Sequence, residues 1–172
     1  MFINFFKHLH LVNKHRFLVM KFCFRLGLYW QGLTHDLSKY SFSEFFTSVR
    51  YFTGLKSPID SEKKEKGYSD CWLHHKGRNK HHWQYWIDFH KGQIVYIEMP
   101  LKYIKEMVAD RIAACMVYQR ENYKPESALD FYLNSQERFS IPPQTGNKLN
   151  YYLSIVAENP LNQALKIIKN DK

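Results

Sequence analysis

Cysteine is scarce in this chain, and its few copies are widely separated. The three cysteines, Cys23, Cys71 and Cys115, lie among apolar or aromatic neighbours and form no C-x-x-C pair. An odd number of cysteines at such spacing is typical of reduced, buried thiols and not of a disulfide framework. We therefore predict a cytoplasmic protein without structural disulfides.

Long apolar runs and common catalytic motifs are absent as well. No run approaches the ~18–20 residues that a helix needs to cross a bilayer, so no membrane span is predicted. The N-terminus, with a single lysine before residue 10, does not resemble a secretory signal; residues 2–10 are predicted to form a first helix packed on the core. There is no G-x-S-x-G motif, P-loop or dinucleotide-binding glycine pattern.

Acidic residues are few in the first part of the chain. Residues 1–50 carry seven Lys or Arg against two acids, and the whole chain has a formal net charge of +9. Such a chain attracts anions, among them phosphoesters, nucleotides, nucleic acid and acidic membrane surfaces. Its 172 residues, 45% of them hydrophobic, suit one domain with a substantial core.

Helical patterns dominate the rest of the sequence. Asn13 fits an N-cap and Gly27 a C-terminal stop, which predicts a helix over residues 13–29. Ser41 and Glu44 have the spacing of a capping box, which predicts a helix to about residue 52. After a charged, solvated stretch at 61–67, a helix is predicted to run towards His75 and to stop at Gly77. Further helices are predicted over 100–121, 126–139, 147–157 and 160–170, with a loop at 141–146. Residues 93–98 suit an extended segment with no evident partner strand.

These elements predict an all-α fold, a compact bundle of about six to eight helices. We expect a single domain over residues 1–172. Its metal-site core would span roughly residues 13–120, with the C-terminal helices of 126–170 packed on it.

Two acidic positions stand out as candidate metal ligands. His35 and Asp36 are adjacent; on one helix such side chains point about 100° apart, yet they can converge on one ion or bridge two. Their imidazole and carboxylate groups suit transition metals. Asp110 lies inside the strongest predicted helix, which is apolar on two sides, and an Asp there is costly to bury unless it is paired or metal-bound.

Four histidines within nine residues form a second candidate. They occur in the segment His74-His75-Lys76-Gly77-Arg78-Asn79-Lys80-His81-His82. A tandem pair can place one imidazole inward and one outward, so the sequence leaves open which member of each pair faces a site. Some of them could instead form a polar loop or hydrogen-bond to ligands.

The order of these residues resembles the HD-domain superfamily, whose members are mostly metal-dependent phosphohydrolases. That family has a His on one helix, a His-Asp pair on the next and an Asp on a later helix; His15, His35, Asp36 and Asp110 follow this order. Residues 32–39 (GLTHDLSK) are similar to its His-Asp signature, including the lysine. The chain is also similar to small bacterial and phage proteins of a family of unknown function, which suggests no substrate.

The resemblance implies a cofactor of one or two divalent transition-metal ions, Mn, Fe, Zn, Co or Ni. Binuclear members carry two further histidines, and His75 and His82 would fill those places, with His74 and His81 as equally spaced alternatives. The short gap between these histidines departs from the family's usual spacing.

Several neighbouring side chains are candidates for the reaction itself. Lys39 and Arg78 would balance charge on a bound phosphoester, and Glu106 would orient a water or a ligand. Trp83 is a candidate wall for a nucleobase, although such aromatics more often belong to a core.

The resulting hypothesis is a metal-dependent phosphohydrolase acting on a small anionic phosphoester such as a nucleotide. Two alternatives stay open. The first is an HD-fold di-iron oxygenase, which shares the ligand set. The second is a non-catalytic basic module that binds nucleic acid and holds a structural metal.

Overall fold

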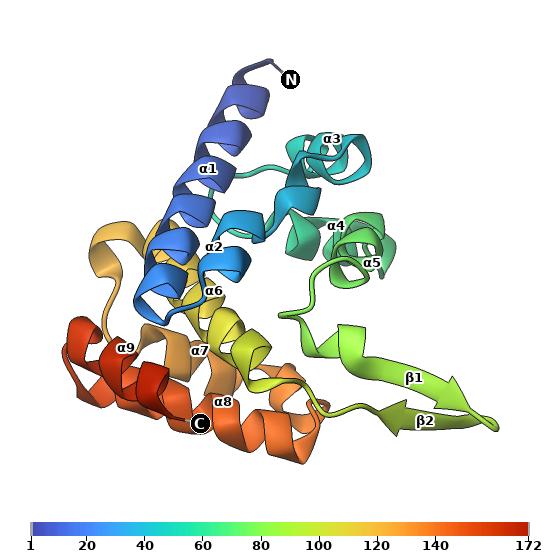
Figure 1. Cartoon of the computed structure of the whole chain (residues 1–172). Helices are drawn as coiled ribbons and strands as arrows, with labels where there is room; N and C mark the ends of the chain where they lie inside the picture. The colour runs from blue at the N-terminus through green and yellow to red at the C-terminus, as the bar shows by residue number, and fades with distance from the viewer. Residues whose placement is uncertain (1, 172) are drawn as a thin grey trace.

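The computed structural model describes residues 2–171 and contains nine α-helices and one short hairpin (Figure 1). The all-α class is confirmed, with more helices than the six to eight predicted. The elements are α1 (Phe2–Arg25), α2 (Tyr29–Thr34), α3 (Phe42–Arg50), α4 (Pro58–Lys66), α5 (Asp70–Lys76), β1 (Ile87–His90), β2 (Gln93–Tyr96), α6 (Leu101–Gln119), α7 (Ser127–Asn134), α8 (Pro143–Glu158) and α9 (Leu161–Asn170). Short 3₁₀ turns cover Leu37–Tyr40, Trp83–Trp86, Arg120–Asn122 and Gln136–Phe139.

Helix α1 is longer than predicted. It runs without a break from Phe2 to Arg25, so Asn13 lies inside it and does not cap a helix. Neither Gly nor Pro interrupts this stretch, and the two predicted helices therefore merge into one. The predicted stop is confirmed: Gly27 follows the helix with a φ of 77°, a left-handed conformation that glycine adopts without strain.

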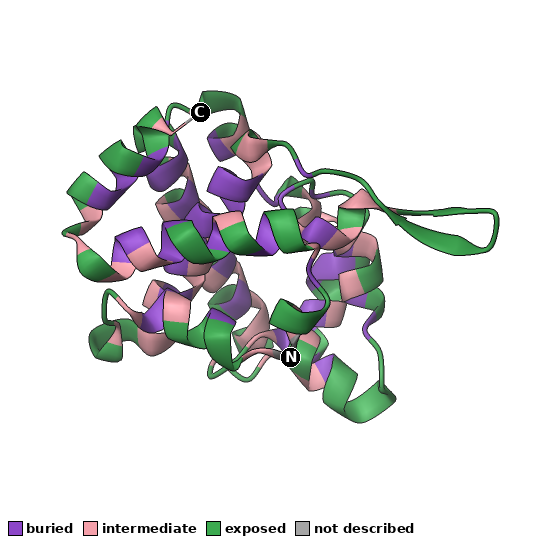
Figure 2. Cartoon of the chain, turned by 90° about the horizontal axis from the view of Figure 1, so that it is seen from below, coloured by how far each residue is buried: buried purple, intermediate pink, exposed green. Residues whose placement is uncertain are grey.

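Helix α6 lies at the centre of the molecule and packs against α1, α7 and α8. Its Val108, Ile112 and Ala113 are fully buried in the main core, which reaches across α8 and α9. In Figure 2 buried positions line the inner sides of these helices, while the hairpin extends outward and is exposed. Because α1 and α6 are the two longest helices and lie side by side, residues on their facing sides can share one site.

The segment between residues 58 and 98 differs from its prediction in two ways. The charged stretch belongs to α4, which ends at Lys66 with Gly67 (φ 81°) as its C-cap, and the chain restarts as a separate helix α5. Glu62 in this stretch is not solvated but fully buried. The extended segment does have a partner: Gln93–Tyr96 pairs antiparallel with Ile87–His90, with Ile87 opposite Tyr96.

The C-terminal helices also shift relative to their predicted bounds. The predicted helix 126–139 is divided, because α7 ends at Asn134 and a 3₁₀ turn follows at 136–139. Helix α8 starts at Pro143, inside the predicted loop, because proline fits the first turn of a helix. Within residues 2–171, no helix has the length and apolar character of a membrane span.

Candidate metal centre

Four predicted ligands from three parts of the chain meet in the interior. His15 comes from α1, His35 and Asp36 follow α2, and Asp110 comes from α6. Each offers one ligand atom, and these atoms all lie within 4.8 Å of one another. His15, His35 and Asp36 are buried, while the Asp110 side chain keeps 18% of its surface exposed. This first group has the size and chemistry to hold a metal ion.

A second group of the same size shares one member with the first. It consists of Asp36, His75, His81 and His82. Asp36 directs Oδ2 towards the first group, 3.3 Å from His35 Nε2, and Oδ1 towards the second, 3.3 Å from His75 Nε2 and 3.5 Å from His81 Nε2. One carboxylate therefore faces both groups, as a bridging ligand between two ions would.

A turn, and not a helix, gives Asp36 this position. His35 is the residue after α2, and Asp36 adopts a left-handed conformation with φ 53° and ψ 28°. The expectation of a His-Asp pair on one helix is therefore wrong. Among non-glycine residues Asp tolerates this conformation better than most, and such strained positions concentrate at functional sites.

Carboxylates outside the two groups orient the imidazoles. Glu106 accepts from His35 Nδ1 at 2.9 Å and lies 3.3 Å from His81 Nδ1, while Glu44 accepts from His75 Nδ1 at 2.8 Å. Each contact occupies Nδ1 and turns Nε2 inward, an arrangement that metal-binding histidines commonly use. Glu106 thus contacts two of the candidate ligand histidines, His35 and His81.

The inward-facing atoms include several buried polar atoms without a hydrogen-bond partner in the described part of the chain. They are the Nε2 atoms of His15, His35, His81 and His82, and Oδ1 of Asp36. Buried polar groups are nearly always satisfied, so a convergent set of unsatisfied ones calls for a ligand. Nitrogen and carboxylate donors of this kind fit a transition metal.

Glu44 is the partner that the sequence analysis missed. Its spacing from Ser41 suggested a capping box, and Ser41 Oγ does accept from the Glu44 N–H at 3.4 Å. The carboxylate, however, is 1% exposed and accepts from both His74 and His75. Its place on the buried side of α3 beside Phe45 could have revealed this role, because a buried acid requires hydrogen-bonding or charged partners.

The ambiguity in the tandem histidines is resolved by these contacts. His75 belongs to the second group, whereas His74 lies outside it on Glu44. His81 and His82 both belong to the second group, so the choice between them does not arise. The two adjacent rings precede the 3₁₀ turn at 83–86, in a loop where neighbouring side chains need not point apart.

The start of α5 is anchored by a buried acid. Ser69 caps the helix by accepting from the Trp72 N–H at 2.9 Å, and its own hydroxyl donates to Glu62 at 2.6 Å. Because Glu62 is fully buried, this pair fixes the first turn of α5 on α4. His75 in the last turn of α5 is positioned by that anchor.

The ionisation of the groups follows from burial and their mutual charges. Burial raises the pKa of Asp36 and Asp110, but interactions with neighbouring histidines outweigh it and hold both pKa values well below the ordinary range. Burial lowers the His35 pKa, yet the Asp36 charge and hydrogen bonds to carboxylates raise it well above its usual value. Burial and nearby cationic groups lower the pKa of His15 and His82. Ionised carboxylates and neutral imidazoles are the forms that bind metals.

The remaining predicted residues lie at different distances from the cluster. Lys39 Nζ is 2.7 Å from Asp36 Oδ2, and the side chain is 27% exposed. Arg78 is exposed and donates to the His74 carbonyl, so it lies outside the cluster. Trp83 is 7% exposed in the main core and donates to Glu137, a position that offers no wall to a ligand.

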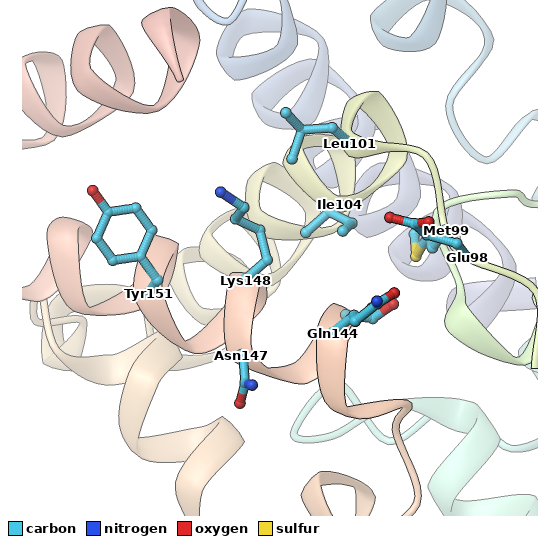
Figure 3. Close-up of a pocket in the computed structure, with 9 residues that line it drawn as sticks. Glu98, Met99, Leu101, Ile104, Gln144, Asn147, Lys148 and Tyr151 are labelled. Carbon is cyan, nitrogen blue, oxygen red and sulfur yellow. The ribbon is translucent and has the colours of Figure 1, made fainter. Parts of the chain in front are cut away.

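A cavity of about 440 Å³ opens onto the cluster at His82 and Asp110. Its walls are largely apolar or aromatic and include Trp72 and Tyr118, with Lys63 among the charged side chains that line it. A second hollow, between the start of α6 and α8, includes no member of the cluster (Figure 3). The first of these two hollows therefore gives a ligand access to two of the candidate ligands, His82 and Asp110.

Residues 4–155 match the family of unknown function DUF5662, and the chain belongs to that family. No curated protein and no solved structure matches the chain. The family covers every member of the two ligand groups, from His15 to Asp110.

Proposed function

We propose that this protein is a metal-dependent phosphohydrolase that holds two divalent transition-metal ions. The observation that carries the proposal is the orientation of Asp36, which presents one carboxylate oxygen to each ligand group. His15, His35 and Asp110 would complete the first site. The second would be completed by the three histidines grouped with Asp36, which are His75, His81 and His82.

The bound ions would supply Lewis acidity to a phosphoryl oxygen and lower the pKa of a water molecule. The chain's own side chains would hold the histidine rings in orientation and neutralise charge on the bound phosphoryl group. Glu106 and Glu44 keep the Nδ1 atoms of their histidines engaged, which fixes the ring orientation that binding needs. Lys39, paired with Asp36 yet partly exposed, is placed to neutralise an oxygen of a bound phosphoryl group.

The cavity supports a substrate with an organic part beside its phosphate. Trp72 and Tyr118 offer an apolar and aromatic lining next to His82 and Asp110, and Lys63 adds a cation. A flat group such as a nucleobase fits this combination. The positive net charge of +9 favours an anionic substrate at long range.

Metal content of the purified protein, measured by elemental mass spectrometry beside hydrolysis of a nucleotide and aryl-phosphate panel, tests the proposal. We expect close to two ions per chain and phosphate release. Asp36→Asn should lose both the metal and the activity, whereas Asp88→Asn, at an exposed site on β1, should keep both. Circular dichroism checks that each variant is folded.

Two outcomes would replace the proposal. Two irons with oxygen consumption and no phosphate release would identify a di-iron oxygenase, which uses similar donors. A protein that takes up no manganese, zinc or iron(II) would contradict both enzymes. Salt-sensitive nucleic-acid binding by that metal-free protein would favour the binding module.

A further inference from the structure

The outer side of α1 carries two parallel rows of exposed side chains. Residues seven positions apart shift by only about 20° around a helix, so they form a line along it. Ile3, His10, Phe17 and Phe24 form one such line and Lys7, Lys14 and Lys21 the next, and all seven are exposed. The apolar side chains of the first line are well exposed to solvent, with Ile3 69% and Phe17 61% exposed. In Figure 1 the N-terminal half of α1 runs along the edge of the molecule.

Helix α2 widens the apolar line. It packs closely on α1, since a Cβ at Gly32 would lie 3.0 Å from the Cys23 side chain. Its Tyr29 ring meets Phe24 edge-on at 5.4 Å, and Tyr29 and Trp30 are 61% and 73% exposed. We call the set Ile3, Phe6, Phe17, Phe24, Tyr29 and Trp30 the outer aromatic face.

Within residues 2–59 every exposed charged side chain is positive. Between residues 2 and 59 the chain has two acids, Asp36 and Glu44, and both are 1% exposed because they belong to the metal cluster and its partners. Lys7, Lys14 and Lys21 beside the face therefore have no exposed acid from this part of the chain to balance them. The neighbouring helix α9, which contacts α1, contains no acid either.

We propose that the outer aromatic face binds the surface of an anionic lipid bilayer. Exposed apolar patches on a protein usually mark contact sites, and Trp and Tyr favour the level of the lipid headgroups. The lysine row would reach anionic headgroups while its stems pack beside the Phe side chains. A helix of 24 residues, about 36 Å long, lying flat on the surface suits this contact.

Other occupants fit these observations less well. A second copy of the chain would bring lysine rows of the same sign together, which opposes self-association. Single-stranded nucleic acid would stack its bases on aromatic rings, but Ile3 and the neighbouring Leu33, 51% exposed, offer no ring. These two aliphatic side chains favour contact with lipid.

Vesicle flotation with the full chain tests the proposal. We expect binding to vesicles of phosphatidylglycerol and phosphatidylcholine in equal parts, weaker binding at high salt, and little binding to pure phosphatidylcholine. Phe6→Ser with Phe17→Ser, and separately Lys14→Glu with Lys21→Glu, should each reduce partitioning roughly tenfold or more. The matched control is Phe89→Ser with Lys124→Glu, because both residues are exposed, one on β1 and the other in the loop before α7.

Trp30 provides a direct readout of orientation. Brominated lipid in the vesicles should quench tryptophan fluorescence, and Trp30→Phe should remove most of that quenching. Unchanged metal content in the face variants separates this test from the proposed enzyme function, on which it does not depend.

Three results would overturn the lipid proposal. The first is no flotation, or equal flotation with neutral and anionic vesicles. The second is binding of an oligonucleotide, but not of vesicles, that depends on Phe17. The third is a dimer in analytical ultracentrifugation that the Phe variants dissociate.

Discussion

His8 makes a testable contribution to the pH dependence of stability. It is 5% exposed on α1, its ring lies 5.2 Å from Phe45 and 5.4 Å from Phe52, and its Nδ1 has no hydrogen-bond partner among the described residues. Burial, assisted by the positive charge of Lys39, lowers the His8 pKa from 6.5 to about 4. The folded protein therefore keeps this imidazole neutral through a range in which the unfolded chain protonates it.

The sign and size of the effect follow from linkage. Between pH 6.5 and 4 the unfolded state binds more protons at this position, so stability falls as the pH falls. The loss amounts to about 2 kcal/mol at pH 5 and approaches roughly 3 kcal/mol once both states are protonated. It is absent above pH 7.

Urea unfolding of wild type and His8→Leu between pH 7.5 and 4.5 measures the contribution as a difference, which cancels the titration of the candidate metal ligands. Leucine has a similar volume but does not titrate, so the variant should gain about 2 kcal/mol on wild type between pH 7.5 and 5. His10→Leu, at an exposed position on the same helix, is the control and should show no such gain. If the free energies of unfolding of wild type and His8→Leu change with pH in parallel, the reasoning is refuted.

Further predictions concern the cluster and the end of the fold. Because the His35 pKa is raised well above its usual value, metal uptake at pH 7 should release about one proton from it, measurable by titration calorimetry in buffers of different ionisation enthalpy. Glu106→Gln should weaken the binding of both ions by about 10- to 100-fold, because Glu106 contacts a histidine of each group. Glu44→Gln should mainly weaken the binding of one ion, because Glu44 contacts His75. Glu98→Gln is the control and should leave metal binding unchanged. Lys105 is buried and donates to two carbonyls at the end of α9, so Lys105→Met should lower the free energy of unfolding by about 1.5–3 kcal/mol in a urea titration; an unchanged midpoint would contradict it.

The types of the candidate ligands could be read from the sequence because burial restricts them. An Asp in the middle of an apolar helix, as Asp110 is, needs a partner wherever the helix packs. His15 and His35 do not follow from burial; they are predicted from the residue order that resembles the HD-domain superfamily. The structure brings these residues together with His75 and His82. The sequence reasoning therefore identified side chains that do lie close together in the fold.

The geometry that couples the two groups depends on local conformation, which periodicity does not report. A helical pattern places Glu44 on the buried side of α3 but does not say which histidine it contacts. The hairpin was incomplete in the prediction because β1 lies within a segment dominated by aromatic residues. The first turn residue after it is Lys91 at φ 49°, a position where Gly or Asn is the usual turn signal. Tertiary contacts decide such positions.

The left-handed conformation of Asp36 leads to a last prediction, made on a matched pair of variants. Asp36→Ala and Asp36→Gly both remove the carboxylate, so both should lose the metal. They differ in backbone preference: at φ 53° alanine pays about 1 kcal/mol or more that glycine does not. In the presence of a chelator Asp36→Gly should therefore unfold at higher urea than Asp36→Ala.

At an ordinary position glycine would instead be the less stable variant, because it loses more conformational entropy on folding. The order of the two midpoints thus tests the backbone directly. If Asp36→Ala is the more stable, residue 36 leaves the left-handed conformation when the carboxylate is removed. The surrounding backbone then does not fix the directions of Oδ1 and Oδ2. If Asp36→Gly is the more stable, the turn is held by its surroundings, and one backbone conformation sets the directions of the two Asp36 carboxylate oxygens in the absence of any ion.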